Sequence, residues 1–221
     1  LMDQMASSVG NIITIDFANP AHPDVEPVQV DFSKAGLALC ILDSCADHAD
    51  LTDEYAAVRK EMESVAAYLG KSVLREVDES EFVKNIADIR SSCGDRAVLR
   101  AMHFYGDNAR VEKQAAALRA GDFKTFMKYI IESGRSSYMY NQNVYSCKKA
   151  AEQPVSLALS LSEKLLDGCG AWRVHGGGFA GTIQAFVPLN KLDEYKDLME
   201  RVFGSGSCYV LSVRPVGGVE L

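Results

Sequence analysis

The stretch Gly170-Ala-Trp-Arg-Val-His-Gly-Gly-Gly-Phe-Ala-Gly-Thr182 decides how the last quarter of this chain folds. Four of the six residues at positions 176–181 are glycine, and β-branched or aromatic residues stand on both sides. Glycine loses the most backbone entropy on folding, so a dense glycine run is expected where φ is positive or where another group approaches the backbone closely. We therefore predict a turn at residues 176–181 that joins two strands.

Two interpretations of this turn stay open. Successive free N–H groups in a glycine turn form a concavity that suits phosphate, but a plain hairpin turn has the same composition. A dinucleotide-binding fingerprint would require a helix after the glycines. Here Thr182-Ile-Gln-Ala-Phe-Val187 has the pattern of a second strand, and the Gly-Lys-Ser/Thr ending of a P-loop is missing.

The composition bounds the class of protein. A chain of 221 residues with 48% hydrophobic content can bury a substantial core. Its 23 Lys and Arg against 30 Asp and Glu give a net charge of −7, which argues against nucleic acid or an anionic membrane as the main partner. The longest apolar run, residues 36–42, is much shorter than the ~20 residues of a membrane span. Six scattered cysteines without a C-x-x-C pair are typical of reduced thiols in a cytoplasmic protein.

The hydrophobic periodicity predicts an α+β fold, with a mainly antiparallel sheet covered by helices on one face and no linker that would divide the chain. Residues 1–221 are thus expected to form a single domain. Because the chain starts with Leu1, we expect it to be part of a longer protein. The predicted strands are residues 12–17, 28–32, 37–42, 172–175, 182–187 and 208–213, and the predicted helices are residues 52–69, 79–91, 95–120, 122–133, 154–166 and 191–203.

Separated segments carry motifs that agree with one another along nearly the whole chain. In this order they resemble the galactokinases, members of a small-molecule kinase family that also contains homoserine, mevalonate and phosphomevalonate kinases. The segments are Leu1-Met-Asp-Gln-Met-Ala-Ser7, His48 with Asp53-Glu-Tyr-Ala-Ala-Val-Arg59, Leu69-Gly-Lys-Ser-Val-Leu-Arg-Glu-Val77, Arg100-Ala-Met-His-Phe104, Ala115-Ala-Ala-Leu-Arg-Ala-Gly-Asp-Phe123, Arg173-Val-His-Gly-Gly-Gly-Phe-Ala-Gly181 and Arg214-Pro-Val-Gly-Gly218.

The resemblance implies the C-terminal portion of a two-domain enzyme with its active site between the domains. It implies ATP and a small-molecule sugar as ligands, with Mg²⁺ bound by residues of the first half. The sugar-binding and phosphate-loop motifs of that first half are not found in this sequence. We therefore expect the isolated chain to be inactive, with no metal ligand of its own and with an unknown oligomeric state.

The resemblance also implies roles for individual residues, and each has a structural alternative. Asp3 corresponds to the base that acts on the anomeric hydroxyl of galactose, although an Asp at this position is also suited to capping a short helix. Tyr55 corresponds to a sugar contact, but it also begins the apolar stripe of its own helix. The family's glycine-rich loop, which lies beside the phosphate loop and thus near the phosphates, corresponds to Gly176, Gly177, Gly178 and Gly181. The resemblance favours support of the phosphate loop over direct contact with phosphate, and hairpin geometry alone also explains these glycines.

The sequence departs from the family pattern after the helix that ends near residue 133. Gly134 stands where galactokinases commonly have a histidine, and the tyrosine-rich Tyr138-Met-Tyr-Asn-Gln-Asn-Val144 that follows is unusual. Four functions remain possible: a galactose 1-kinase, a kinase for a related sugar, a catalytically silent sugar-sensing regulator, and a binding module that derives from the second half alone.

Overall fold

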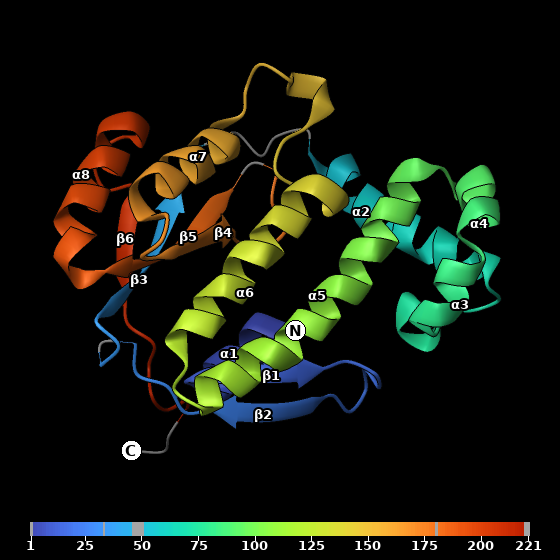
Figure 1. Ribbon diagram of the computed structural model, residues 1–221, viewed down its shortest axis with the longest axis horizontal. Helices are drawn as coiled ribbons and strands as arrows, with labels where there is room; N and C mark the ends of the chain where they lie inside the picture. The colour runs from blue at the N-terminus through green and yellow to red at the C-terminus, as the bar shows by residue number, and fades with distance from the viewer. Residues whose placement is uncertain (1, 33, 46–50, 180, 219–221) are drawn as a thin grey trace.

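The strand β3 (Leu37–Asp43) occupies the middle of the main sheet, as its continuous apolar sequence predicts. The computed structural model describes residues 2–32, 34–45, 51–179 and 181–218. In it, β3 pairs with β5 (Thr182–Pro188) and β6 (Cys208–Leu211), and β5 also pairs with β4 (Ala171–Val174), which gives the order β4-β5-β3-β6 (Figure 1). Every pairing is antiparallel, so the α+β prediction is confirmed.

The remaining elements surround this sheet. A separate two-stranded sheet stands at one end of it, so the six predicted strands form two sheets instead of one. Among the described residues these elements are α1 (Met2–Val9), β1 (Ile12–Asp16), β2 (Asp24–Val28), α2 (Thr52–Tyr68), α3 (Glu79–Lys84), α4 (Ile86–Cys93), α5 (Asp95–Arg119), α6 (Phe123–Ser136), α7 (Pro154–Leu166) and α8 (Leu192–Phe203), with short helical turns at Leu74–Glu76, Ser137–Asn141, Cys147–Lys149 and Leu189–Lys191.

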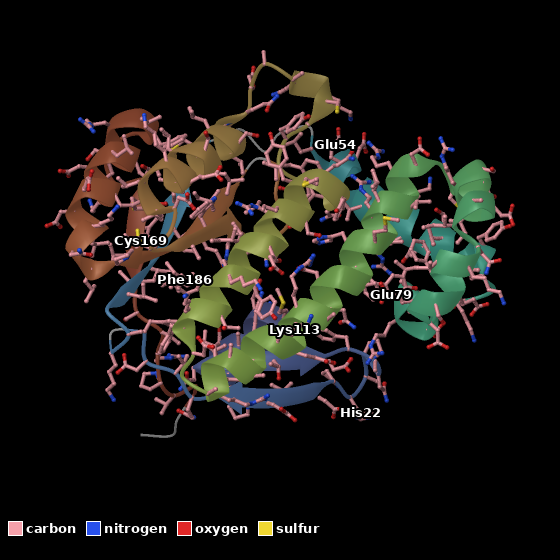
Figure 2. The ribbon with its side chains drawn as sticks, in the orientation of Figure 1. His22, Glu54, Glu79, Lys113, Cys169 and Phe186 are labelled. Atoms are coloured by element: carbon pink, nitrogen blue, oxygen red, sulfur yellow. The ribbon has the colours of Figure 1, made fainter. Side chains whose placement is uncertain are left out.

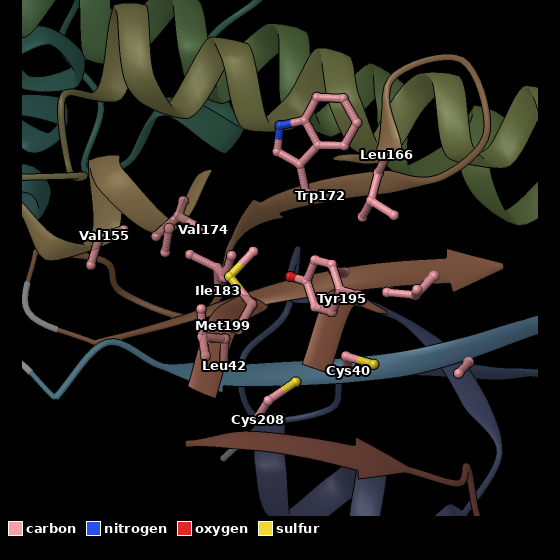
Figure 3. Packing of buried hydrophobic residues seen from close by; sticks show 14 of the residues in the cluster. Cys40, Leu42, Val155, Leu166, Trp172, Val174, Ile183, Tyr195, Met199 and Cys208 are labelled. Atoms are coloured by element: carbon pink, nitrogen blue, oxygen red, sulfur yellow. The ribbon is translucent and has the colours of Figure 1, made fainter. Parts of the chain in front are cut away.

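Helices α7 and α8 cover one face of the main sheet. Alternate residues of β3 and β5, such as Leu42 and Ile183, point into this layer, as the two-residue period of a strand requires. They meet Tyr195 and Met199 of α8, both completely buried (Figure 3). This cluster is the larger part of the core around the sheet.

The opposite face of the sheet is also partly covered, which corrects the expectation of helices on one face only. Phe186 of β5 packs against Phe126 of α6 and Phe32, with ring centroids 5.1 Å apart in both pairs. Leu37 and Leu118 join the same cluster. The sheet is therefore held between α7 and α8 on one side and the adjoining ends of α5 and α6 on the other.

The second strand lies earlier in the chain than predicted. β2 ends at Val28, where the expected strand of residues 28–32 was to begin. Val28 pairs with Ile12, the first residue of β1, so the chain beyond Val28 has no partner strand to extend along. The side chain of Asn11 instead accepts the backbone N–H of Val30 (3.3 Å) and donates to Gln29 (2.7 Å).

The predicted helix of residues 79–91 is two helices. Asn85 separates α3 from α4, with φ −103° and ψ 12°, outside the helical range. Its side-chain amide donates to the carbonyl of Glu81 at 2.8 Å. Asn side chains compete with the backbone for such bonds, which is why a continuous apolar period failed to reveal the break.

A buried polar cluster joins α5 to α6. His103 of α5 places Nδ1 2.9 Å from the hydroxyl of Ser136, and its Nε2 lies 3.7 Å from Asp107. Burial is the main cause that lowers the pKa of His103 below its ordinary value of 6.5; the Asp107 carboxylate opposes the shift, and Arg173 and Arg110 add to it. His103 is thus a buried histidine with a hydrogen-bonding partner.

This cluster predicts a pH dependence of stability. The folded protein binds the proton of His103 less readily than the unfolded chain, so stability decreases as the pH falls below 6.5 toward the lowered folded pKa. We expect His103→Gln to lose less free energy of unfolding than the wild type between about pH 7.5 and about pH 5.5. Urea unfolding at both pH values measures this, and equal losses in the two proteins would contradict it.

The two ends of the described chain, helix α1 and the segment after β6, lie in contact with each other. Helix α1 contains no buried residue and packs beside β1. The guanidinium of Arg214 donates to the carbonyl of Ser7 (2.9 Å), and the N–H of Gly218 donates to that of Ser8 (3.2 Å). Hydrogen bonds to the C-terminal segment therefore hold α1 in place more than buried apolar area does.

Candidate functional site

The glycine turn, predicted at residues 176–181, connects β4 to β5, and the structure describes its residues 176–179 and 181. φ is positive at Gly176 (+64°), Gly178 (+84°) and Phe179 (+58°) but not at Gly177, and a turn of such mixed conformations is of the kind that directs neighbouring N–H groups toward one side. The N–H of His175 donates to Thr182 at 2.9 Å and closes the hairpin. None of the described residues accepts a hydrogen bond from the N–H groups of residues 176–178.

Tyr55 and the glycine turn are brought together. Residue 55 lies in the first turn of α2, and its hydroxyl donates to the carbonyl of Gly178 at 2.7 Å. Its ring meets Phe179 edge to face, with centroids 5.2 Å apart. A Cβ on Gly177 would lie 2.7 Å from the Tyr55 ring, so only glycine fits there without movement. Because the hydroxyl proton is already donated, Tyr55 has acceptor capacity left for a ligand.

Asn143 is the residue of this site that sequence reasoning missed. It is buried (4% exposed), and its backbone carbonyl accepts the N–H of Phe179 at 2.5 Å. Its side-chain amide donates to the carbonyl of Gly177 at 3.2 Å. A Cβ on Gly178 would lie 1.9 Å from the same Asn143 carbonyl oxygen. The only sequence signal was the unusual composition of residues 138–144.

The segment after Asn143 is bonded to the start of α2. The hydroxyl of Ser146 donates to Glu54 at 2.8 Å, and the ammonium of Lys148 lies 3.4 Å from Asp53. Figure 2 shows Glu54 at the end of α2 that faces this segment. On the other side of the turn, the hydroxyl and N–H of Ser44 both donate to the carbonyl of Gly181, at 2.5 and 3.2 Å. The turn is therefore held from three parts of the chain.

A cavity of about 670 Å³ lies beside the turn. Phe179 forms part of its wall, together with Ser44, Leu51, Ser146 and Pro154. This volume is within the range of small-molecule sites. Within the described parts of the chain, His, Cys, Asp and Glu side chains form no group of three or more that could hold a metal ion.

Asp3 is not brought to the turn. It lies exposed in the first turn of α1, with neither a hydrogen bond nor an ion pair to any described residue. The glycine turn lies at the end of the sheet where Asp43 of β3 pairs with Thr182 of β5. Leu37, at the other end of β3, packs near β2. Figure 1 shows α1 beside β1, away from the β4–β5 turn. His48, which contributed to the sequence resemblance, lies outside the described residues.

Gly134, where the sequence departs from the pattern it resembles, has a packing reason. Gly134 lies in α6 where the helix crosses β4, and a Cβ there would be 2.9 Å from Cβ of Arg173 and 3.1 Å from the carbonyl oxygen of Trp172. The guanidinium of Arg173 donates to the hydroxyl of Ser133, the residue that precedes Gly134, at 2.8 Å. Burial lowers the pKa of this guanidinium, and Asp107 opposes the shift. Position 134 therefore serves close helix–strand packing in this chain.

Comparison with proteins of known sequence identifies the relatives of this chain. It is 31% identical to the galactokinase of Homo sapiens over 215 residues, which is 96% of this chain and 50% of that protein. It is 33% identical to the galactokinase of Bos taurus over 214 residues, 95% of this chain and 50% of that protein. The chain thus spans about half the length of the curated relatives it matches. No protein-family model matches the chain.

Solved structures show the same fold. Lactococcus lactis galactokinase complexed with galactose superposes with a TM-score of 0.68 at 21% identity, covering 96% of this chain and 54% of that one. L. major mevalonate kinase in complex with R-mevalonate superposes with a TM-score of 0.52 at 10% identity, covering 93% and 50%. At these identities the two superpositions establish the fold alone.

Proposed function

Because this chain belongs to the galactokinase family, as a counterpart of the C-terminal portion of those enzymes, we propose that it forms half of an ATP-dependent kinase for the anomeric hydroxyl of galactose. The observation that carries this proposal is identity of 31–33% to two galactokinases along more than nine-tenths of the chain. The fold it shares with a galactokinase complexed with galactose agrees with the proposal. We further propose that the other half supplies the rest of the active site.

Asp3 is the proposed general base. Transfer of a phosphoryl group to a sugar needs a carboxylate that orients the hydroxyl and accepts its proton. The Asp3 carboxylate is exposed in the first turn of α1 and is not engaged with a described residue, so it is free to meet a substrate. Its distance from the glycine turn requires that the sugar extend toward α1, or that α1 be placed by the other half.

Tyr55 and the glycine turn form the proposed wall on the other side of the substrates. In this proposal Tyr55 accepts a hydrogen bond from a sugar hydroxyl while it donates to Gly178. The N–H groups of Gly176, Gly177 and Gly178, which donate to none of the described residues, suit the anionic phosphates of ATP, and Gly181 closes the turn. ATP would supply the phosphoryl group that is transferred.

Among the described residues, no group of three His, Cys, Asp or Glu side chains could hold Mg²⁺. From the family resemblance we propose that the metal ligands belong to the other half, and we derive no step through the ion. The structure contains no helix, within its described residues, that is long and apolar enough to cross a membrane. All six cysteines are free thiols, which supports our proposal of a cytoplasmic location.

The isolated 221-residue chain is expected not to phosphorylate galactose. Catalysis in phosphoryl transfer is mostly positioning and electrostatic stabilisation, and the proposed phosphate loop and metal ligands are in the other half. The measurement is a coupled ADP-release assay with galactose, ATP and Mg²⁺, with a complete galactokinase as the positive control. Galactose-dependent turnover above background by the chain alone would contradict the division of labour proposed here.

The assay on the complete protein tests the function itself. Galactose-dependent ADP release supports the galactose 1-kinase, and turnover with a different sugar alone would support a related sugar kinase. Saturable binding of sugar and ATP without turnover would instead support a sugar-sensing regulator.

A further inference from the structure

The residues that precede Asn143 have an unusual backbone. Helix α6 continues into a π-helical turn, Ser137–Asn141, in which the N–H of Gln142 donates to the carbonyl of Ser137 at 2.8 Å. Gln142 then adopts the left-handed conformation, with φ 53° and ψ 46°. Such π-turns are uncommon and occur frequently at functional sites. Here the widened turn and the left-handed residue bring Asn143 under the glycine turn.

Asn143 holds the turn by two hydrogen bonds, accepting one through its backbone carbonyl and donating the other through its side-chain amide. Its carbonyl oxygen accepts from Phe179 (2.5 Å), and its side-chain NH₂ donates to the carbonyl of Gly177 (3.2 Å). The opposite orientation of the amide would place two oxygens against each other, so the NH₂ must face Gly177. Its Oδ1 is buried and has no hydrogen-bond partner among the described residues, so the bond to Gly177 is the one that these residues give the side chain.

These bonds fix the directions of two peptide planes. In a trans peptide the C=O and the following N–H point in opposite directions. Holding the carbonyl of Gly177 toward Asn143 therefore directs the N–H of Gly178 away from it. The Tyr55 hydroxyl fixes the next carbonyl, that of Gly178, from α2. The N–H of Gly178 has no acceptor among the described residues, so its direction depends on the bond of the Asn143 side chain to the carbonyl of Gly177 in the same peptide plane.

We propose that Asn143 is a positioning residue that orients the N–H of Gly178, in the glycine turn, toward the bound phosphates. It acts through the carbonyl of Gly177 and does not touch substrate. Because Asn143 is buried under the turn, its side chain is confined. Gly178 already lies so close to the Asn143 carbonyl that the turn cannot move nearer to it. The catalytic consequence rests on the proposed function, whereas the orientation of the turn does not.

The first experiment measures the orientation in this chain by the ¹H–¹⁵N resonances of Gly177, Gly178 and Phe179. Asn143→Asp keeps the size and the backbone carbonyl but sets an oxygen against that of Gly177, so we expect these resonances to shift at pH 7.5. As the pH is lowered toward about 5, the buried carboxyl becomes protonated, regains a donor, and the resonances return toward those of the wild type. A purely structural role would not produce this reversal.

The matched control is Asn141→Asp. Asn141 is similarly buried (7% exposed), and its side-chain oxygen also lacks a partner, but its side chain makes no bond to the turn. We expect its turn resonances to match the wild type at both pH values. If Asn143→Asp does not fold, Asn143→Ala removes the donor without the repulsion and is expected to shift the resonance of Gly178. Unshifted turn resonances in the Asn143 variants would overturn the proposal.

The second experiment uses steady-state kinetics of the complete protein. We expect Asn143→Asp to lower kcat about 10–100-fold, because small misplacements of positioning groups cost factors of this size, with the KM for galactose within about twofold of the wild type. Asn141→Asp is expected to leave both within about twofold. Unchanged kcat with shifted resonances would overturn the catalytic part alone. Absence of kinase activity in the wild type would count against the proposed function, while the resonances would still decide the orientation.

Discussion

Asp3→Asn in the complete protein is expected to lower kcat by about 10²–10⁴-fold, the usual effect of removing a general base. The substitution keeps the shape and hydrogen-bonding reach of the side chain but removes its ability to accept a proton. The KM for ATP should change little, because Asp3 is proposed to act on the sugar hydroxyl. Steady-state kinetics with galactose and ATP varied in turn would separate the two parameters.

Asp193→Asn is the matched control for Asp3→Asn. Asp193 is also exposed and lies in the first turn of a helix, α8, so the change removes the same favourable charge at a helix N-terminus. We expect kcat of this variant to stay within about twofold of the wild type. If Asp3→Asn is also within a few-fold of the wild type, Asp3 has a positional role only, and the structural alternative of a helix-capping Asp would be favoured.

Gly178→Ala in the 221-residue chain is expected to cost about 3 kcal/mol of the free energy of unfolding, from left-handed strain combined with overpacking. The backbone at Gly178 has φ +84°, which an L side chain adopts poorly. The added Cβ would also lie 1.9 Å from the Asn143 carbonyl oxygen, a backbone atom that cannot rotate away. Urea unfolding followed by circular dichroism gives the change in stability.

Gly176→Ala separates the two causes. Gly176 has φ +64° but no atom within 4 Å of an added Cβ, so this variant should show the strain alone, about 1 kcal/mol. The difference between the variants measures the contact of the turn with Asn143. If both lose the same stability, the turn can move away from Asn143, and the proposed positioning contact is weaker than its geometry indicates.

The sheet could be predicted because its signals are local. Glycines between two β-branched runs identified the turn, and the continuous apolar run at residues 37–42 identified the central strand. The errors came where a side chain changed the backbone hydrogen bonds. Asn85 divides a helix, and its side chain donates a hydrogen bond to the carbonyl of Glu81. Beyond the end of β2, the side chain of Asn11 accepts a hydrogen bond from the N–H of Val30. Neither change alters the hydrophobic period on which the prediction depended.

The candidate site was predictable only in part. For Tyr55, sequence reasoning left a core role and a sugar contact open. The structure adds a third role, since the Tyr55 hydroxyl donates a hydrogen bond to the carbonyl of Gly178. Asn143 meets a glycine 34 positions away, and nothing in its neighbourhood marks that contact. The role of Asp3 stays a prediction, since its side chain forms neither a hydrogen bond nor an ion pair with a described residue.

The bonds between the two ends of the chain bear on how Asp3 reaches its place. Arg214 and Ser7 are 207 positions apart, so the hydrogen bond between them joins segments that are distant in the sequence. Helix α1 contains no buried residue that would strengthen this contact. Such a contact is expected to form last during folding and to open first in the native state, by local unfolding that leaves the sheet intact. The segment that carries the proposed base would then adjust to a docking partner while the glycine turn stays fixed.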